Sequence, residues 1–119
     1  MSMIETPMLQ SLERLLDVSV FRHSLLASNL ANIDTPGYRT RDINFQAALR
    51  QTGAGPFEYA EFTPVARPVQ GLVERPDGNN VSLERESLLL AQNQLQFNAG
   101  IQLIKVEFRR LSIAINEGR

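Results

Sequence analysis

Cysteine is absent from this chain of 119 residues, histidine occurs only once, at His23, and the formal net charge is −1. Without cysteine, disulfide bonds, thiolate metal sites and thiol chemistry are excluded. A charge so close to zero lacks the basic excess that a nucleic-acid platform needs, so no nucleic-acid partner is expected.

Long apolar runs are also missing. No stretch approaches the length needed to cross a bilayer, so direct lipid insertion is not expected. The N-terminus has no basic segment followed by an apolar core, so a cleaved Sec signal peptide is not expected either. Apolar residues make up 43% of the chain, which is too many for wholesale disorder. The composition therefore indicates one small domain or one elongated subunit.

The first periodic segment spans residues 7–33. Thr6 is a candidate N-cap, and Pro7 suits the first position of a helix. Alternating steps of three and four residues from Leu9 trace a stripe in which only Ser19 and His23 are not aliphatic. Such a stripe predicts a helix that packs against other helices. The predicted packing residues on it are Leu9, Leu12, Leu16, Leu26 and Leu30.

The second periodic segment spans residues 82–116. Ser82 is a candidate N-cap, and Glu84 and Glu86 favour the positive N-terminal end of a helix. Leu88 and Leu95 lie off the main apolar stripe, so a two-helix hairpin cannot cover all the apolar surface. Exposed apolar area of this kind indicates partner contacts. The predicted packing residues on this helix are Leu90, Phe97, Ile101, Ile104, Phe108 and Leu111.

Between these helices, the middle segment (residues 42–80) contains four prolines and four glycines. Asn44 is a candidate N-cap for a short helix in which Phe45 and Ala48 share a face. The apolar residues between Phe57 and Val73 predict extended pieces or one short hairpin, and the prolines disfavour a central sheet strand. We therefore predict a mostly α fold with long N- and C-terminal helices and a short Pro/Gly-rich insert, irregular or with a little β structure. The expected organisation is a single elongated subunit divided into residues 1–41, 42–80 and 81–119.

Catalytic chemistry finds little support in the sequence. Ser19 lies one helical turn before His23, within reach of a hydrogen bond, but no orienting carboxylate or oxyanion hole accompanies the pair. We interpret the two as polar residues that interrupt a helix seam and fix its register. The stretch 53–55 lacks the third glycine of a dinucleotide fingerprint, and the cluster 77–80 has its glycine in the wrong place for an EF-hand loop. No catalytic residue, metal or cofactor is predicted.

The most informative part of the chain is the turn motif, residues 28–38, with the sequence SNLANIDTPGY. Thr35 precedes proline and is therefore pushed away from helical backbone angles. Pro36 and Gly37 suit the central pair of a type II turn. Asn29 and Asn32 lie three residues apart, on one face of the last helical turns. The turn motif is thus predicted to end the first helix abruptly and to act as a structural joint.

The turn motif, continued by Arg41-Asp42-Ile43-Asn44-Phe45, resembles the signature of bacterial flagellar basal-body rod proteins. The C-terminal half agrees, with Asp77-Gly78-Asn79-Asn80-Val81 followed by Leu90-Ala91-Gln92-Asn93-Gln94-Leu95-Gln96-Phe97. The N-terminal motif alone is shared by rod and hook proteins, whereas both ends together favour a subunit of the proximal rod. The middle segment matches only in being short and rich in proline and glycine.

This resemblance implies axial subunits that are neither enzymes nor cofactor-binding proteins. Their terminal helices pair as a coiled coil lining the inner tube of a hollow rod, which crosses the periplasm and transmits torque. The implied partners are other proximal and distal rod subunits, the rod-to-membrane-ring adaptor, the membrane-ring protein and the flagellar type III export apparatus, in homo- and hetero-oligomers. Export proceeds without a cleaved signal. The residues that carry the assembly and fold role are Asn29, Asn32, Thr35, Pro36, Gly37 and Tyr38.

Two alternatives remain open at this level. The nearer one is another axial subunit, such as the other proximal rod protein. The more distant one is an export chaperone or adaptor built as a helical hairpin, which would fold alone as a monomer or dimer. An enzyme is a remote third alternative, because it would rest on His23 alone.

Overall fold

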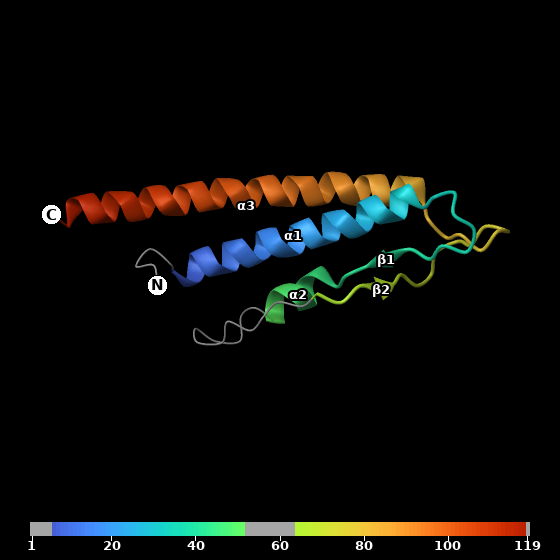
Figure 1. Ribbon diagram of the computed structural model, residues 1–119. Helices are drawn as coiled ribbons and strands as arrows, with labels where there is room; N and C mark the ends of the chain where they lie inside the picture. The colour runs from blue at the N-terminus through green and yellow to red at the C-terminus, as the bar shows by residue number, and fades with distance from the viewer. Residues whose placement is uncertain (1–5, 52–63, 119) are drawn as a thin grey trace.

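The computed structural model describes residues 6–51 and 64–118. The elements are, in chain order, α1 (Pro7–Ala31), β1 (Arg41–Asp42), α2 (Phe45–Gln51), β2 (Arg67–Pro68) and α3 (Leu83–Glu117). Helices α1 and α3 run antiparallel, and α1 lies between α3 and the middle segment (Figure 1). The prediction of a mostly α fold, with long terminal helices and a small β insert, is confirmed.

The first helix begins where its sequence predicts. Thr6 has extended backbone angles, its side chain accepts a hydrogen bond of 3.1 Å from the amide of Leu9, and Pro7 occupies the first helical position. At the other end α1 stops at Ala31, two residues before the predicted end. The amide of Ile33 bonds to the carbonyl of Leu30 at 3.2 Å, a shorter-range bond that tightens the last turn into 3₁₀ geometry.

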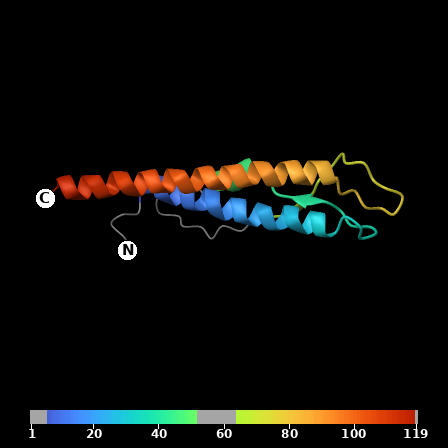
Figure 2. The same ribbon diagram turned by 90° about the horizontal axis from the view of Figure 1, so that it is seen from above.

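The last helix is the longest element, at 35 residues. The Ser82 side chain accepts a hydrogen bond from the amide of Arg85, which confirms the predicted N-cap. The helix continues to Glu117, so that its C-terminal turns extend beyond the start of α1 (Figures 1 and 2). Most of the stability of a helix within a protein comes from packing of one of its faces.

The interface between the two long helices has a seven-residue repeat on α3. Its buried residues are Glu86, Asn93, Gly100 and Glu107, the spacing of a coiled-coil seam. At Gly100 the helices approach so closely that an added Cβ would lie 3.0 Å from Cδ2 of Leu16. The seam on α3 is therefore polar and small, and the aliphatic residues flank it.

The opposite side of α1 packs on the middle segment. Val18, Leu25, Ile43 and Ala48 form the buried apolar cluster. Asn44 caps α2 as predicted, since its Oδ1 accepts a hydrogen bond of 3.0 Å from the amide of Ala47. This cluster places α2 against α1, on the side away from α3 (Figure 1).

The two short strands pair across the middle segment. Arg41 lies opposite Pro68 and Asp42 opposite Arg67, in antiparallel register. Among the described residues of the segment predicted to be extended, Arg67 and Pro68 thus pair with the chain just after the turn motif. Proline is tolerated here because the two-stranded ladder has only edges. The predicted extended residues Phe57, Tyr59 and Phe62 lie outside the described residues.

The molecule is elongated. Its radius of gyration is 18.3 Å and its extents are 68 × 26 × 19 Å, whereas a compact chain of this length has a radius of about 13–14 Å. Within the described ranges, no helix is long and apolar enough to cross a membrane.

Candidate functional site at the end of the helix pair

The turn motif forms the turn that its sequence predicts. The amide of Tyr38 bonds to the carbonyl of Thr35 at 3.2 Å, and Gly37 has a φ of 76°. These are the features of a type II turn with Pro36 and Gly37 at its centre. The chain leaves α1, turns here and returns along it as β1 (Figure 1).

Asn29 connects three parts of the molecule. Its side chain is fully buried. Its Oδ1 accepts hydrogen bonds from the hydroxyl of Tyr38 at 3.0 Å and the amide of Arg41 at 3.2 Å. Its Nδ2 donates to the carbonyl of Arg41 at 2.8 Å and to the carboxylate of Glu86. One carboxamide thereby uses its full hydrogen-bonding capacity to hold α1, β1 and α3 together.

Asn32 serves a local purpose. Its Nδ2 donates to the carbonyl of Ser28 at 2.8 Å, and its Oδ1 accepts a bond of 3.0 Å from the hydroxyl of Thr35. These contacts satisfy groups at the C-terminal end of α1 that would otherwise lack partners. The side chain of Asn29 therefore binds distant parts of the chain, whereas the side chain of Asn32 binds only residues close to it in sequence.

Asn79 caps α1 from a distant part of the chain. Its buried Nδ2 lies 2.9–3.0 Å from the carbonyls of Asn32, Ile33 and Thr35, and its Oδ1 accepts a bond of 2.8 Å from the amide of Val81. Arg75 reaches the same carbonyl of Ile33 through its guanidinium. A cation and an amide donor complement the negative end of the helix dipole.

A second turn docks on the first. The amide of Gly78 bonds to the carbonyl of Arg75 at 2.9 Å, and Gly78 has a φ of 87°. The amide of Gly37 bonds to the carbonyl of Asp77 at 2.9 Å. A Cβ on Gly78 would lie 3.3 Å from Cα of Gly37, so the contact between the turns requires glycine.

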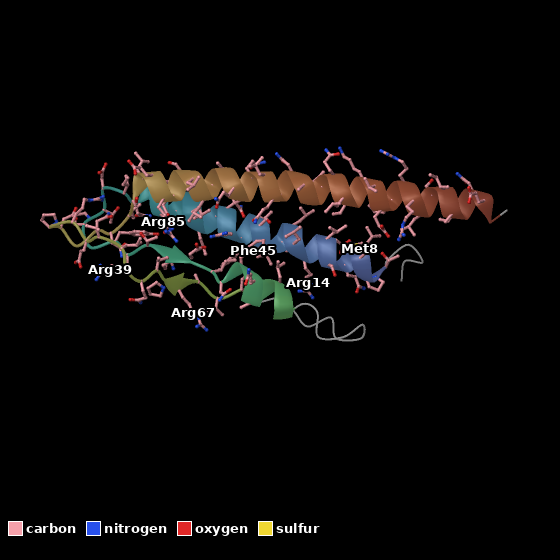
Figure 3. All side chains as sticks on the ribbon, turned by 180° about the vertical axis from the view of Figure 1, so that it is seen from behind. Met8, Arg14, Arg39, Phe45, Arg67 and Arg85 are labelled. Atoms are coloured by element: carbon pink, nitrogen blue, oxygen red, sulfur yellow. The ribbon has the colours of Figure 1, made fainter. Side chains whose placement is uncertain are left out.

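A chain of charges completes this region. Arg22 binds Asp42 in a bidentate fashion at 3.0 and 3.1 Å, and Arg85 lies 3.6 Å from the same carboxylate. Arg85 also pairs at 2.7 Å with Glu86, whose side chain is fully buried. Figure 3 shows Arg85 at the end of α3 near the turns. We call the assembly of Asn29, Asn32, Asn79, Glu86 and the two turns the joint.

The sequence identified the part of the joint that lies in the turn motif, with Asn29 and Asn32. It did not identify the part formed by Asn79 and Glu86. In the sequence, Glu86 indicates only a favourable position at the start of a helix, and Asn79 is one residue of a segment that resembles rod proteins. Their partners lie 57 and 44–47 residues away along the chain, so no local pattern could reveal them.

The joint has the chemistry of a structural element. Its carboxylates and amides are engaged with one another or with the backbone, and the described residues contain no group of three His, Cys, Asp or Glu side chains able to hold a metal. The hydrogen bond considered between Ser19 and His23 is absent: Ser19 Oγ is buried without a partner among the described residues, and His23 is exposed.

The predicted packing residues fall into three groups. Leu9, Leu12 and Leu26 are buried. Phe108 is 46% exposed, although its neighbour Glu107 is buried. The half-buried group consists of Leu16, Leu30, Leu90, Phe97, Ile101, Ile104 and Leu111.

The comparisons with known proteins agree with this picture. Residues 24–39, the last turns of α1 with the type II turn, match the family model described as "Flagella basal body rod protein". The flagellar basal body rod protein FlgB of Cereibacter sphaeroides is 35% identical over 106 residues, which cover 79% of this chain and 82% of the relative. The FlgB proteins of Escherichia coli (29% identical, covering 87% and 88%) and Bacillus subtilis (25%, covering 93% and 95%) are similar over most of both chains.

The fold, the turn motif and the similarity over most of the chain all indicate the same class of protein, the rod proteins of the flagellar basal body. The chain belongs to the FlgB family of that class.

Proposed function

We propose that this chain is a structural subunit of the proximal rod of a bacterial flagellum and that it has no catalytic role. It assembles with other rod subunits into the hollow shaft that transmits torque and through which exported subunits pass. Its place is the basal body, in the part of the rod that spans the periplasm. The family relationship supports this proposal, and so does the structural chemistry of the joint.

The observation that carries the proposal is the apolar outer face of α3. Leu88, Leu95, Val106 and Ile113 are 50–68% exposed. Leu88 and Leu95 follow the seam residues Glu86 and Asn93 by two positions, which places them about 200° around the helix. They therefore point away from α1. We call these four residues the outer stripe. An apolar face of this length needs a partner.

The joint supports the same role. Through Asn29, Glu86 and Asn79 it fixes how the end of α1 meets the start of α3. Torque passed along a rod needs helices that do not slide against each other, and buried polar contacts specify register in helix pairs. The motif residues Asn29, Asn32, Thr35, Pro36, Gly37 and Tyr38 are proposed as the fold determinants of the subunit, which is organised as residues 1–41, 42–80 and 81–119.

The proposed partners are other copies of the chain and the other rod subunits, followed by the rod-to-membrane-ring adaptor and the membrane-ring protein. The flagellar type III apparatus is proposed to export the chain without cleavage of a signal peptide.

The test is deletion of the gene in the bacterium that encodes the chain, with electron microscopy of isolated basal bodies. The proposal predicts membrane rings without a complete rod and loss of swimming, both restored by the wild-type gene on a plasmid. A complete rod in the deletion strain would refute the proposal.

A further inference from the structure

The second turn of the joint contains an aspartate followed by a glycine, Asp77-Gly78. This dipeptide favours spontaneous isomerisation of the aspartate, because glycine has no Cβ to hinder attack by its own backbone nitrogen. Asp77 is the only aspartate of the chain that precedes glycine. Each of the others is followed by a residue branched at Cβ, which crowds that nitrogen; they are Asp17, Asp34 and Asp42.

The isomerisation needs no reagent except water. The backbone nitrogen of Gly78 attacks Cγ of Asp77, and the protonated carboxyl group loses its hydroxyl, which leaves as water with the proton of the nitrogen. The product is a five-membered succinimide ring. Water then opens the ring at one of its two carbonyls, which restores aspartate or gives isoaspartate. One water leaves and one enters, so neither the mass nor the oxidation state of the chain changes.

The contact between the two turns holds both polar groups of the peptide unit that joins Asp77 to Gly78. The carbonyl of Asp77 accepts a hydrogen bond of 2.9 Å from the amide of Gly37, and the amide of Gly78 donates one of 2.9 Å to the carbonyl of Arg75. Ring closure removes the proton from the nitrogen of Gly78 and reorients this peptide unit, so neither bond survives it. The turns must therefore separate before the reaction can proceed.

The side chain of Asp77 is held in the same way. Its Oδ1 accepts a hydrogen bond of 3.0 Å from the amide of Asn79, two residues further on, as is common for aspartate in turns. The side chain of Asn79 is itself bonded to three carbonyls at the end of α1. Asp77 is exposed, so it is the hydrogen bonds of the joint, and not burial, that restrain its carboxyl group.

We propose that Asp77 is a site of spontaneous isomerisation that the docked turns keep closed and that reacts in chains whose joint is open. The rate then follows the population of the open form. Isoaspartate adds one atom to the main chain between Cα of Asp77 and the nitrogen of Gly78, and it replaces the peptide carbonyl that binds Gly37 by a carboxylate. A chain modified in this way cannot dock its turns again, so the joint determines its chemical lifetime.

Incubation of the purified chain at physiological pH and temperature tests the site, once folded and once in guanidinium chloride. Isoaspartate is located by mass spectrometry with electron-transfer fragmentation. It is quantified by methyl transfer from S-adenosylmethionine with a purified isoaspartyl methyltransferase. Isoaspartate at position 77 should form at least roughly tenfold faster in the unfolded chain than in the folded one. Asp34, which precedes Thr35, should react far more slowly in both, and Asp77→Glu should abolish the signal.

Asn79→Ala tests whether the joint controls the rate. The change removes the bonds to the end of α1 and leaves Asp77 and Gly78 in place. It should accelerate isomerisation of the folded chain roughly tenfold, without changing the rate in guanidinium chloride. The matched control is Asn44→Ala, which removes the cap of α2 away from the joint and should leave both rates unchanged. If circular dichroism shows that Asn79→Ala does not fold, Gly37→Ala takes its place, because a Cβ at this φ of 76° is strained but meets no clash.

The isomerised chain can also be separated by reversed-phase chromatography and refolded. It should unfold at a lower denaturant concentration than the unmodified chain, because its turns no longer dock. An unchanged midpoint would contradict this consequence of the modification.

Equal rates in the folded and the unfolded chain would overturn the proposal, since the docked turns would then not close the site. So would isomerisation at Asp77 no faster than at Asp34 in guanidinium chloride, or equal rates in folded Asn79→Ala and Asn44→Ala. The inference concerns the isolated chain and does not rest on the proposed function. None of these outcomes changes the result of the gene deletion.

Discussion

At the scale of single residues, stability depends on a few buried polar groups in the joint. The side chain of Asn29 makes four hydrogen bonds, to the turn, β1 and α3, whereas the side chain of Asn32 bonds only to its own helix end and turn. Removing a partner from a buried polar group costs more than removing a local bond near the surface. The two asparagines of the motif therefore offer a matched comparison.

We predict that Asn29→Ala lowers the free energy of unfolding by about 3 kcal/mol, because the Arg41 backbone and the Glu86 carboxylate lose a partner together. Asn32→Ala should lower it by about 1 kcal/mol or less. Urea unfolding of the purified chain, followed by circular dichroism, measures both. Equal losses would show that Asn29 does not connect the elements as described.

Glu86 is the buried charge of the joint, and Glu84 is its exposed neighbour. We predict that Glu86→Gln destabilises the chain by about 3–5 kcal/mol, since it breaks a buried ion pair and leaves Arg85 with the more distant Asp42. Glu84→Gln should cost only about 0.3–1 kcal/mol through the helix dipole. Thermal and urea unfolding of the two variants measure these losses. A decrease of less than about 1 kcal/mol in the free energy of unfolding for Glu86→Gln would contradict this role.

At the scale of elements, the sequence predicted both long helices, their caps and the type II turn. These features depend on neighbours within a few residues, as at Thr6, Ser82 and Pro36. The seam of α3 was not predicted, because it consists of Glu86, Asn93, Gly100 and Glu107 and so has no apolar signal. The apolar periodicity instead marked the flanking positions, which are half-buried or, at Phe108, exposed.

Gly100 sets the distance between α1 and α3. We predict that Gly100→Leu destabilises the hairpin by at least about 1 kcal/mol, because overfilling the contact with Leu16 outweighs the gain in helix propensity. Ala99→Leu, at the exposed neighbouring position, should change stability by about 0.5 kcal/mol or less. Unfolding midpoints of both variants provide the measurement. If the Gly100→Leu variant were more stable than the wild-type chain, the helices would have to separate freely at this point.

At the scale of the whole molecule, one face of the helix pair has no packing partner within the described chain. One face of α1 packs on α3 and the other on the middle segment, but α3 has nothing described on its outer side. The sequence indicated this surplus of apolar surface and identified two of its residues, Leu88 and Leu95, which are 59% and 68% exposed. The contact between Ser19 and Asn93 was not predicted, because the two residues lie 74 positions apart in the sequence.

The most direct measurement is the accessibility of the outer stripe before and after assembly. Leu95→Cys introduces the only thiol into the chain, at a position that is 68% exposed in the single subunit. A maleimide should label it rapidly in the purified monomer and at least roughly tenfold more slowly in intact basal bodies, with labelling restored when the basal bodies are dissociated. Equal labelling in monomer and basal body would contradict a rod subunit that assembles through this face of α3.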